Sequence, residues 1–438
     1  MSRIRSHLIS SELIRCGVTR PAQKLTGADL LVRHVGVPLF YVYRQGLNVE
    51  QVKQSLRLAA THHPMVCGRL QNGPDQQPVL IGNDAGMSFD VYECKGALPD
   101  YGPHHPMHRD ASSLSSAVLP WQVIRGQQPL MRHRVYRFED GAAVLSINTV
   151  HSMVDGSTMW NFLMDWSAVA RGLDVAGPVQ DRDCMYELMQ RAASVPYTRG
   201  VMIAPGFWPK ARLLPQLAMQ AFSNKLGVYR ISAKAIEGMR QTVPEGTERP
   251  ERISAADLIT AHAIKLMAPT QGHRRDRVLG MVSDLRYRKA LNLPQRMFGN
   301  ALGQESCTFS HEALSTQTEG ELALAFKQAG AMHSAEESMG YLGLLERHRR
   351  AGTITQLVPQ SVMKTADGGF VQNNYLHLPI YGLDLGTGKP TWFNPQTVLF
   401  RMLKLVPTPE GDGSVDIYLT AAPSEHPPFE ALYGVTRL

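Results

Sequence analysis

One continuous segment, residues 132–171, constrains the fold of this chain more than any other. Two strand-like runs, RHRVYRF and AAVLSINTV, flank a Glu-Asp-Gly turn at 139–141 and predict a β-hairpin. From about Gly156 to Arg171 the large apolar residues recur at helical spacing, which predicts an amphipathic helix. A hairpin that leads directly into such a helix predicts a β-sheet covered by helices.

Strands and helices alternate in the rest of the chain as well. Two helix starts are predicted, at Asn48 with Gln51 and at Ser254 with Asp257, because each pair has the spacing of a capping box. Strands are predicted at 37–43, 227–231, 278–285, 370–380, 396–405 and 415–420. Mixed strands and helices in both halves predict the α/β class.

The length and the position of the prolines predict how these elements are grouped. A chain of 438 residues is too long for one ordinary core. Prolines recur after residue 172 and periodic segments are rare there, which indicates a long connection. We therefore predict an N-terminal domain at 1–175, a crossover linker at 176–225 and a C-terminal domain at 226–438.

Composition and charge narrow the class of protein. Hydrophobic residues make up 43% and charged residues 19%, which is typical of a globular protein. The formal net charge is +7, but no block of Lys and Arg concentrates it, so nucleic acid is not an expected partner. The first residues lack the apolar run of a secretory signal, and no stretch approaches about 20 apolar residues. We therefore expect no membrane span and a cytoplasmic location.

The cysteines and histidines do not predict a metal site. The five cysteines are scattered and form no C-x-x-C pair, which argues against a disulfide framework and a structural zinc site. The run PHHPMH at 103–108 is broken by prolines, so its histidines do not share one helical face. We expect no metal.

The motif with the clearest chemical meaning is HSMVDG at 151–156. His151 follows an alternating, half-buried strand, and Asp155 with Gly156 has the pattern of a helix start. Histidine has its proton equilibrium nearest neutral pH, and as a general base it contributes roughly 10²–10⁴-fold to a rate. The alternative is a structural histidine, because H-x-x-x-D-G alone is a short pattern. The sequence contains neither an H-E-x-x-H zinc motif nor a G-x-S-x-G nucleophile elbow.

Further segments support the functional interpretation. The HSMVDG run resembles the HxxxDG signature of the BAHD-type acyltransferases, which belong to the chloramphenicol acetyltransferase-like superfamily. Four more segments are similar to segments of that family in the same order: 49–70, 253–268, 282–302 and the YGLDLGTGKPTWF run at 381–393. The resemblance covers nearly the whole chain. It implies two chloramphenicol acetyltransferase-like α/β domains, each a mixed sheet flanked by helices, with a channel between them.

The resemblance also implies roles for individual residues. His151 matches the catalytic histidine, while Asp155 and Gly156 support its loop, and Asp155 is expected to form a salt bridge with Arg286. In the DLGTGKP segment the resemblance implies an architectural role for Asp384, Gly386 and Gly388. Here Leu385 and Thr387 replace the family's Phe and Trp.

The sequence does not decide the roles of two further residues, Thr387 and Asn300. Thr387 could donate a hydrogen bond to a developing oxyanion or be a loop residue without a chemical role. Asn300, in the segment 282–302, is a second candidate for an oxyanion or channel position.

The implied activity is transfer of an acyl group from acyl-CoA to a hydroxyl or amine of a small molecule. Acyl-CoA is then a co-substrate, and no cofactor is expected. One alternative is a condensation-type enzyme that takes its acyl group from an acyl carrier protein, and another is a silent binding protein on the same fold. The single histidine of the motif and the DLGTGKP segment favour the first interpretation.

Overall fold

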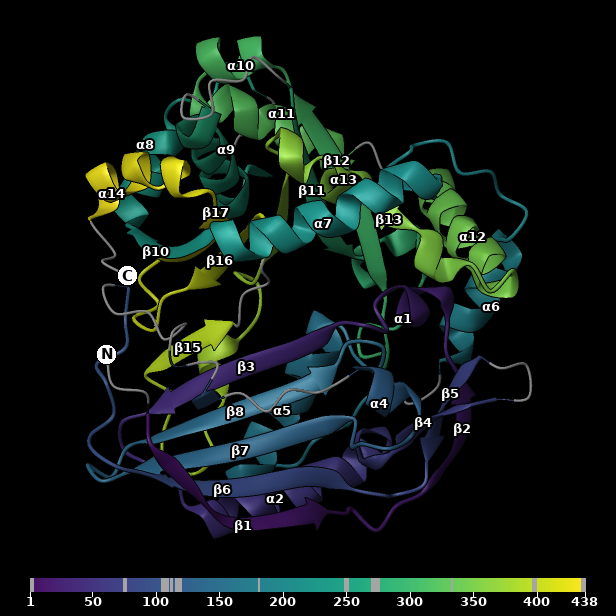
Figure 1. Ribbon diagram of the computed structural model, residues 1–438, viewed down its shortest axis with the longest axis vertical. Coiled ribbons are helices and arrows are strands. Elements are labelled where there is room, and N and C mark those ends of the chain that lie inside the picture. The colour runs from purple at the N-terminus through teal and green to yellow at the C-terminus, as the bar shows by residue number, and fades with distance from the viewer. Residues whose placement is uncertain are drawn as a thin grey trace.

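The computed structural model contains two large β-sheets, one above the other in Figure 1. It describes residues 4–73, 77–103, 110, 113–114, 120–179, 182–247, 252–268, 276–331, 334–395 and 400–434. Each large sheet has six strands, and helices pack on both. The expected α/β class, with a mixed sheet in each half, is confirmed.

The first sheet is built almost entirely from the N-terminal half. Its strands run in the order β1 (Ser6–Ile14), β6 (Met87–Cys94), β7 (Met131–Phe138), β8 (Ala143–Val150), β3 (Gly36–Tyr43) and β15 (Trp392–Pro395). The predicted hairpin is present as the antiparallel pair β7 and β8. Helices α2 (Val49–His62) and α5 (Gly156–Ala170) pack against each other behind this sheet (Figure 1).

The second sheet comes from the C-terminal half. Its strands run in the order β10 (Lys225–Ile231), β17 (Val415–Ala421), β16 (Met402–Pro407), β14 (Phe370–Asn374), β11 (Arg277–Asp284) and β12 (Leu302–Phe309). Helices α8 (Ala233–Arg240), α9 (Ala255–Met267) and α11 (Glu319–Ala331) pack together in this half. Leu403 and Leu405 of β16 point into the core on this helical side.

Smaller elements complete the fold. A three-stranded sheet has the order β2 (Arg20–Lys24), β5 (Pro78–Gly82) and β4 (Arg69–Asn72), and β9 (Met202–Ile203) pairs with β13 (Val358–Pro359). The remaining helices are α1 (Gly27–Leu31), α4 (Pro120–Ile124), α6 (Asp183–Ala192), α7 (Phe207–Ser223), α10 (His311–Thr316), α12 (Ala335–Arg350), α13 (Gln360–Met363) and α14 (Pro427–Tyr433). In the part of the chain that the structure describes, no helix combines the length and the apolar character needed to cross a bilayer.

Both predicted helix starts are confirmed. Asn48 caps α2 by accepting from the backbone N–H of Gln51 at 3.2 Å. Ser254 and Asp257 form a complete capping box at α9. The predicted strand at 370–380 ends early, at Asn374, because the Asn374 side chain accepts from the N–H of Leu376 and turns the chain. Of the predicted strand at 396–405, residues 396–399 lie outside the described residues, and β16 begins at Met402.

The crossover differs most from the sequence-based expectation. The segment predicted as a linker, 176–225, contains helices α6 and α7. Pro209 lies in the first turn of α7, where its missing N–H costs nothing, so proline there did not indicate a loop. Strand β15, from the C-terminal half, pairs with β3 in the first sheet. A single cut near residue 226 therefore does not separate the two hydrophobic cores, because Tyr341 and Phe393 belong to the first.

Candidate active site

A cavity of about 380 Å³ lies between the two sheets. Strand β3 and the start of α5 line it from the first sheet, while β11, β12, β14 and β16 line it from the second. His151, the residue directly after β8, is one of the lining residues. The structure thus brings the motif histidine to a cavity shared by both halves of the chain.

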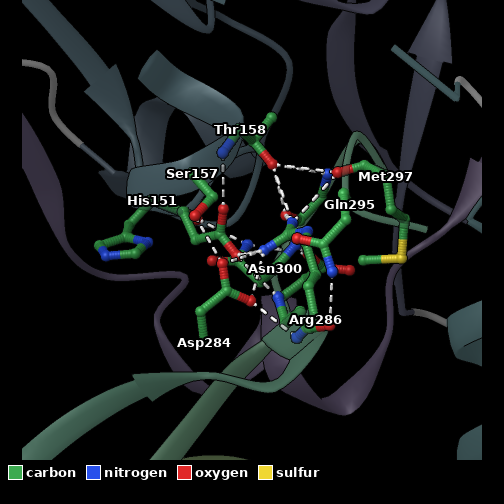
Figure 2. A network of polar contacts seen from close by, with 12 residues as sticks. His151, Ser157, Thr158, Asp284, Arg286, Gln295, Met297 and Asn300 are labelled. Carbon is green, nitrogen blue, oxygen red and sulfur yellow. Dashed lines mark hydrogen bonds and ion pairs between the residues drawn. The ribbon is translucent and has the colours of Figure 1, made fainter. Parts of the chain in front are cut away.

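The backbone of His151 is held from two sides. Its N–H donates to the carbonyl of Val35 at 2.9 Å, and the side-chain amide of Asn300 donates to its carbonyl at 2.9 Å. The ring atom Nδ1 is buried and has no hydrogen-bond partner among the described residues. Figure 2 shows the His151 ring pointing away from the polar network beside it. The loop is therefore fixed while the imidazole remains available to the cavity.

Asp155 lies at the centre of that network. It caps α5 by accepting from the N–H of Thr158 at 2.9 Å, and it also accepts from the N–H of Ala301 at 2.8 Å. Arg286 Nη1 donates to Asp155 Oδ2 at 2.7 Å, so the expected ion pair is present. Burial raises the pKa of this carboxyl, but the Arg286 charge and the hydrogen bonds outweigh it, and the pKa is lowered overall.

Arg286 connects the two halves of the protein through this network (Figure 2). It follows β11 and is 2% exposed. Besides Asp155, its guanidinium donates to Asp284 at 3.0 Å, to Thr158 Oγ1 at 3.0 Å and to the carbonyl of Gly299 at 2.7 Å. Removing one member of such a buried pair leaves an uncompensated charge, which costs about 3–5 kcal/mol.

The second motif, DLGTGKP, is organised around its own backbone. Asp384 Oδ1 accepts from the N–H groups of Gly386 at 2.9 Å and Gly388 at 3.0 Å. Both glycines have positive φ angles, +94° and +104°, which favour a residue without a Cβ. A Cβ on Gly386 would also lie 2.0 Å from the side-chain nitrogen of Gln51. None of these three motif residues is among the described residues that line the cavity.

The two candidates for an oxyanion or channel position, Thr387 and Asn300, both hydrogen-bond to groups of the first domain. Thr387 donates its hydroxyl to the carbonyl of Gly46 at 3.0 Å, so the DLGTGKP loop uses it to attach to the first domain. Asn300 is 1% exposed and donates to Asp29 and to the His151 carbonyl. Neither is among the described residues that line the cavity.

Several polar cavity residues were not singled out in the sequence. Ser157 Oγ donates to Asp284 Oδ2 at 2.5 Å at one wall. Burial lowers the pKa of His377, another lining residue. The signal that could have found others is strand alternation, because Val371 and Asn373 of β14, and Met402 and Lys404 of β16, all line the cavity.

Lys404 is the clearest case of that alternation. In MLKLVP its neighbours Leu403 and Leu405 enter the core, whereas Lys404 lines the cavity, opposite Asn373 in register. Lys404 is 6% exposed, and burial lowers its pKa to about 7. The cavity wall formed by the second sheet therefore combines apolar side chains with a few polar ones.

One group of metal-ligand residue types occurs among the described residues: Cys16, Cys67 and Asp84. Asp84 already accepts from the backbone N–H groups of Cys16 at 2.8 Å and Gly17 at 2.9 Å, which explains its position. None of the three lines the cavity. Residues 104–108 of the PHHPMH run lie outside the described residues. All five cysteines are free thiols.

Comparison with known proteins identifies the family. A model of the Transferase family matches residues 9–430. This chain therefore belongs to the Transferase family, and the expected BAHD-type acyltransferase is confirmed. The protein is an acyl-CoA-dependent acyltransferase. It is 23% identical to hydroxycinnamoyltransferase of Narcissus pseudonarcissus over 93% of this chain and 94% of the relative. It is 22% identical to anthranilate N-benzoyltransferase protein 2 of Dianthus caryophyllus, with coverages of 93% and 96%.

Solved structures show the same fold. Vinorine synthase has a TM-score of 0.68 at 19% identity, and the match covers 97% of this chain and 96% of that one. F. graminearum TRI101, in complex with coenzyme A and T-2 mycotoxin, has a TM-score of 0.69 at 13% identity, with coverages of 94% and 97%. The first condensation domain of the CDA synthetase is less similar, with a TM-score of 0.55. The expected arrangement of two acetyltransferase-like domains is confirmed.

Proposed function

We propose that His151 is the general base that activates the acceptor of this acyltransferase. The observation that carries the proposal is its place at a cavity between the two sheets, on a loop fixed by a buried ion pair. Because Nδ1 is buried, we assign proton transfer to Nε2. A hydroxyl or amine of a small acceptor would give its proton to this nitrogen as it attacks the acyl-CoA carbonyl.

The remaining steps follow from the transfer of the acceptor proton to His151. Attack on the thioester carbonyl forms a tetrahedral intermediate, and its collapse breaks the carbon–sulfur bond. The imidazolium then returns its proton to the departing CoA thiolate, so that an ester or amide and free CoA are released. No covalent acyl-enzyme is formed, and this chemistry needs no cofactor beyond the acyl-CoA co-substrate.

The supporting residues act on the position of His151 and not on the substrate. Asp155 is committed to Arg286, Thr158 and Ala301, so its carboxylate is not placed to share the proton of His151. Its role, and that of Gly156 at the start of α5, is to hold the turn that carries the histidine. Asp384, Gly386 and Gly388 support the attachment of the second motif to the first domain.

The acceptor class follows from the cavity and from the relatives. Both an O-acyltransferase, shikimate O-hydroxycinnamoyltransferase of Nicotiana tabacum, and an N-acyltransferase, that of Dianthus, match this chain. We propose an alcohol, phenol or amine of a size that the cavity admits, with polar substituents near Asn373 and Lys404. The cytoplasm remains the predicted compartment.

The test is release of free thiol from a panel of acyl-CoA thioesters in the presence of alcohols and amines. The His151→Ala variant should lose turnover at least 10²-fold while its melting temperature is unchanged. Wild-type turnover in that variant would overturn the mechanism. Release of thiol from acyl-CoA that requires the acceptor and is lost in His151→Ala would support the proposed role of the histidine.

A further inference from the structure

Helix α7 exposes most of its large apolar side chains on the outside of the protein. Its exposed large residues are Phe207 (75%), Trp208 (73%), Leu214 (70%), Met219 (65%) and Phe222 (93%). A contiguous exposed patch of this kind marks an interaction site more often than scattered single residues do. Figure 1 shows α7 crossing the front of the second half of the molecule.

The inward face of α7 is less apolar than that of an ordinary surface helix, because it combines the buried Leu213 with two glutamines. These are Gln216 and Gln220, whose side-chain amides both donate to Thr365 Oγ1, at 3.4 and 3.3 Å. Gln220 is 8% exposed, less than any of the five large apolar residues on the outer face. A helix that must only cover a core places its apolar stripe inward. The outer face of α7 is therefore not explained by the packing of this chain.

The outer face of α7 is an apolar arc with a cationic residue near each edge. At 100° per residue, an arc of roughly 140° contains only apolar residues. These residues are Phe207, Trp208, Ala211, Leu214, Pro215, Ala218, Met219 and Phe222. Lys210 lies just beyond one edge of the arc and Arg212 just beyond the other. The helix contains no Asp or Glu.

We propose that α7 binds the surface of an anionic membrane, with the apolar arc in the lipid interface and the two cations at the headgroups. Interfacial helices combine a broad apolar face containing Trp, Phe and Leu with Lys or Arg at its borders. Long cationic side chains reach the headgroups while their stems stay in the apolar region. The helix lies on the surface in this mode, which differs from a membrane span.

The charges disfavour a second copy of this chain as the occupant of the face. In a symmetric dimer across α7, the helix of each copy would bring Lys210 and Arg212 to the interface, and α7 offers no acidic group to pair with them. Asp367, which lies two residues after the Thr365 that contacts α7, already pairs with Lys364 at 3.6 Å. An anionic lipid surface complements these cations, and the net charge of +7 acts in the same direction.

Helix α7 lies close to one wall of the cavity, so membrane binding through α7 would affect access to the cavity. Thr365, which accepts from both glutamines, donates to the carbonyl of Val362, and Val362 lines the cavity. Docking through α7 would therefore place one side of the cavity close to the lipid surface. An apolar acceptor or acyl group dissolved in the membrane would have a short path to it.

The test is flotation of the full-length protein with vesicles of phosphatidylcholine, with and without phosphatidylserine. We expect binding to the mixed vesicles that weakens as salt increases, and a blue shift of the fluorescence of Trp208. Brominated lipids should quench that fluorescence, and the Trp208→Phe variant should lose the quenching but not the binding.

Two variants decide the outcome. Leu214→Asp with Phe222→Asp should reduce vesicle binding at least tenfold, and so should Lys210→Glu with Arg212→Glu. The matched control is Leu58→Asp on α2, at a side chain that is 49% exposed, which should bind as the wild type does. All variants should keep full turnover with a water-soluble acceptor, so this test is separate from that of the catalytic proposal. Absence of vesicle binding, or concentration-dependent dimerisation that the α7 variants abolish, would overturn the proposal.

Discussion

Two motif aspartates, Asp155 and Asp384, look alike in the sequence but differ in the structure. Asp155 is 3% exposed and pairs with Arg286 beneath the histidine loop. Asp384 is only half-buried and holds two backbone N–H groups of its own loop. The first supports a cavity residue directly, whereas the second attaches a C-terminal loop to the first domain. A motif residue therefore indicates family membership more reliably than it indicates closeness to the chemistry.

The largest expected effect on catalysis concerns His151, the cavity residue whose loop Asp155 supports. The variant His151→Ala should lose at least 10²-fold in kcat, because it removes the proposed base. Activity should decrease through kcat at every pH, since no other group takes the proton. Steady-state kinetics across a pH series measures this, and a variant whose kcat recovers at high pH would mean that another group supplies the base.

The next effect concerns the buried aspartate. The variant Asp155→Asn keeps the shape of the side chain but removes the more buried of the two carboxylates that pair with Arg286, and leaves only Asp284 as its counter-charge. It should lose about 3–5 kcal/mol of unfolding free energy. Because the folded pKa of Asp155 is lowered, its stabilisation is present above the unfolded pKa near 3.8 and is lost as the pH falls through the folded value. Urea unfolding at several pH values should show the gap from wild type narrowing in acid. Equal unfolding free energies at neutral pH would contradict the role given to the ion pair.

Replacing the buried Lys404 should increase the unfolding free energy, an effect opposite in sign to that of Asp155→Asn. The pKa of Lys404 is lowered to about 7, because burial disfavours the protonated lysine. The resulting destabilisation of the fold is complete below pH 7 and disappears as the pH rises toward 10.5. The variant Lys404→Met should therefore gain about 4–5 kcal/mol of unfolding free energy below pH 7, which corresponds to the lowering of the lysine pKa from 10.5 to about 7. The gain should vanish near pH 10. A gain that is independent of pH would mean that the lysine is neutral throughout or that the methionine simply packs better.

The loop aspartate should matter less. In Asp384→Asn the amide oxygen can still accept from Gly386 and Gly388, so only the charge assistance of these hydrogen bonds is lost. We expect a loss of about 1 kcal/mol in unfolding free energy and an unchanged kcat. Measuring this variant beside Asp155→Asn tests the comparison directly, because the substitution is identical. If Asp384→Asn were the more damaging of the two, the ranking drawn from burial would be wrong.

The smallest effect is expected at Thr387. Its hydroxyl donates to Gly46 on a partly exposed loop, so Thr387→Val should lose no more than about 1 kcal/mol and keep the wild-type kcat. A decrease in kcat of tenfold or more would restore Thr387 as an oxyanion donor. Thermal melting and initial rates are sufficient to separate these outcomes.

Much of the fold was predictable because the signals are local. The β7–β8 hairpin, the caps at Asn48 and Ser254 and the start of α5 each depend on residues within a few positions of one another. The helix α7 was not predicted, since its apolar face points outward and it contains Pro215. The transfer of β15 to the first sheet was not predictable either, because no local pattern records which sheet a strand joins.

In the candidate site, too, the features that depend on long-range contacts could not be predicted from local patterns. The Asp155–Arg286 pair spans 131 positions and was expected only from the family resemblance. Lys404 and Asn373 meet in register across two strands, which a single sequence does not reveal. The sequence left open whether Thr387 donates to an oxyanion or is a loop residue, and it could not show that the hydroxyl of Thr387 bonds to Gly46 or that Asn300 bonds to Asp29, because both contacts are long-range.

The pairing of β15 with β3 restricts how this protein can move. Opening the two lobes like a hinged shell would require separating four residue pairs, from Trp392 with Val42 to Pro395 with Leu39. Substrates are therefore expected to thread into an assembled body and not to be enclosed by it. Release of product would then depend on the width of the passage, and side-chain rotation at its rim would set the turnover of bulky acceptors.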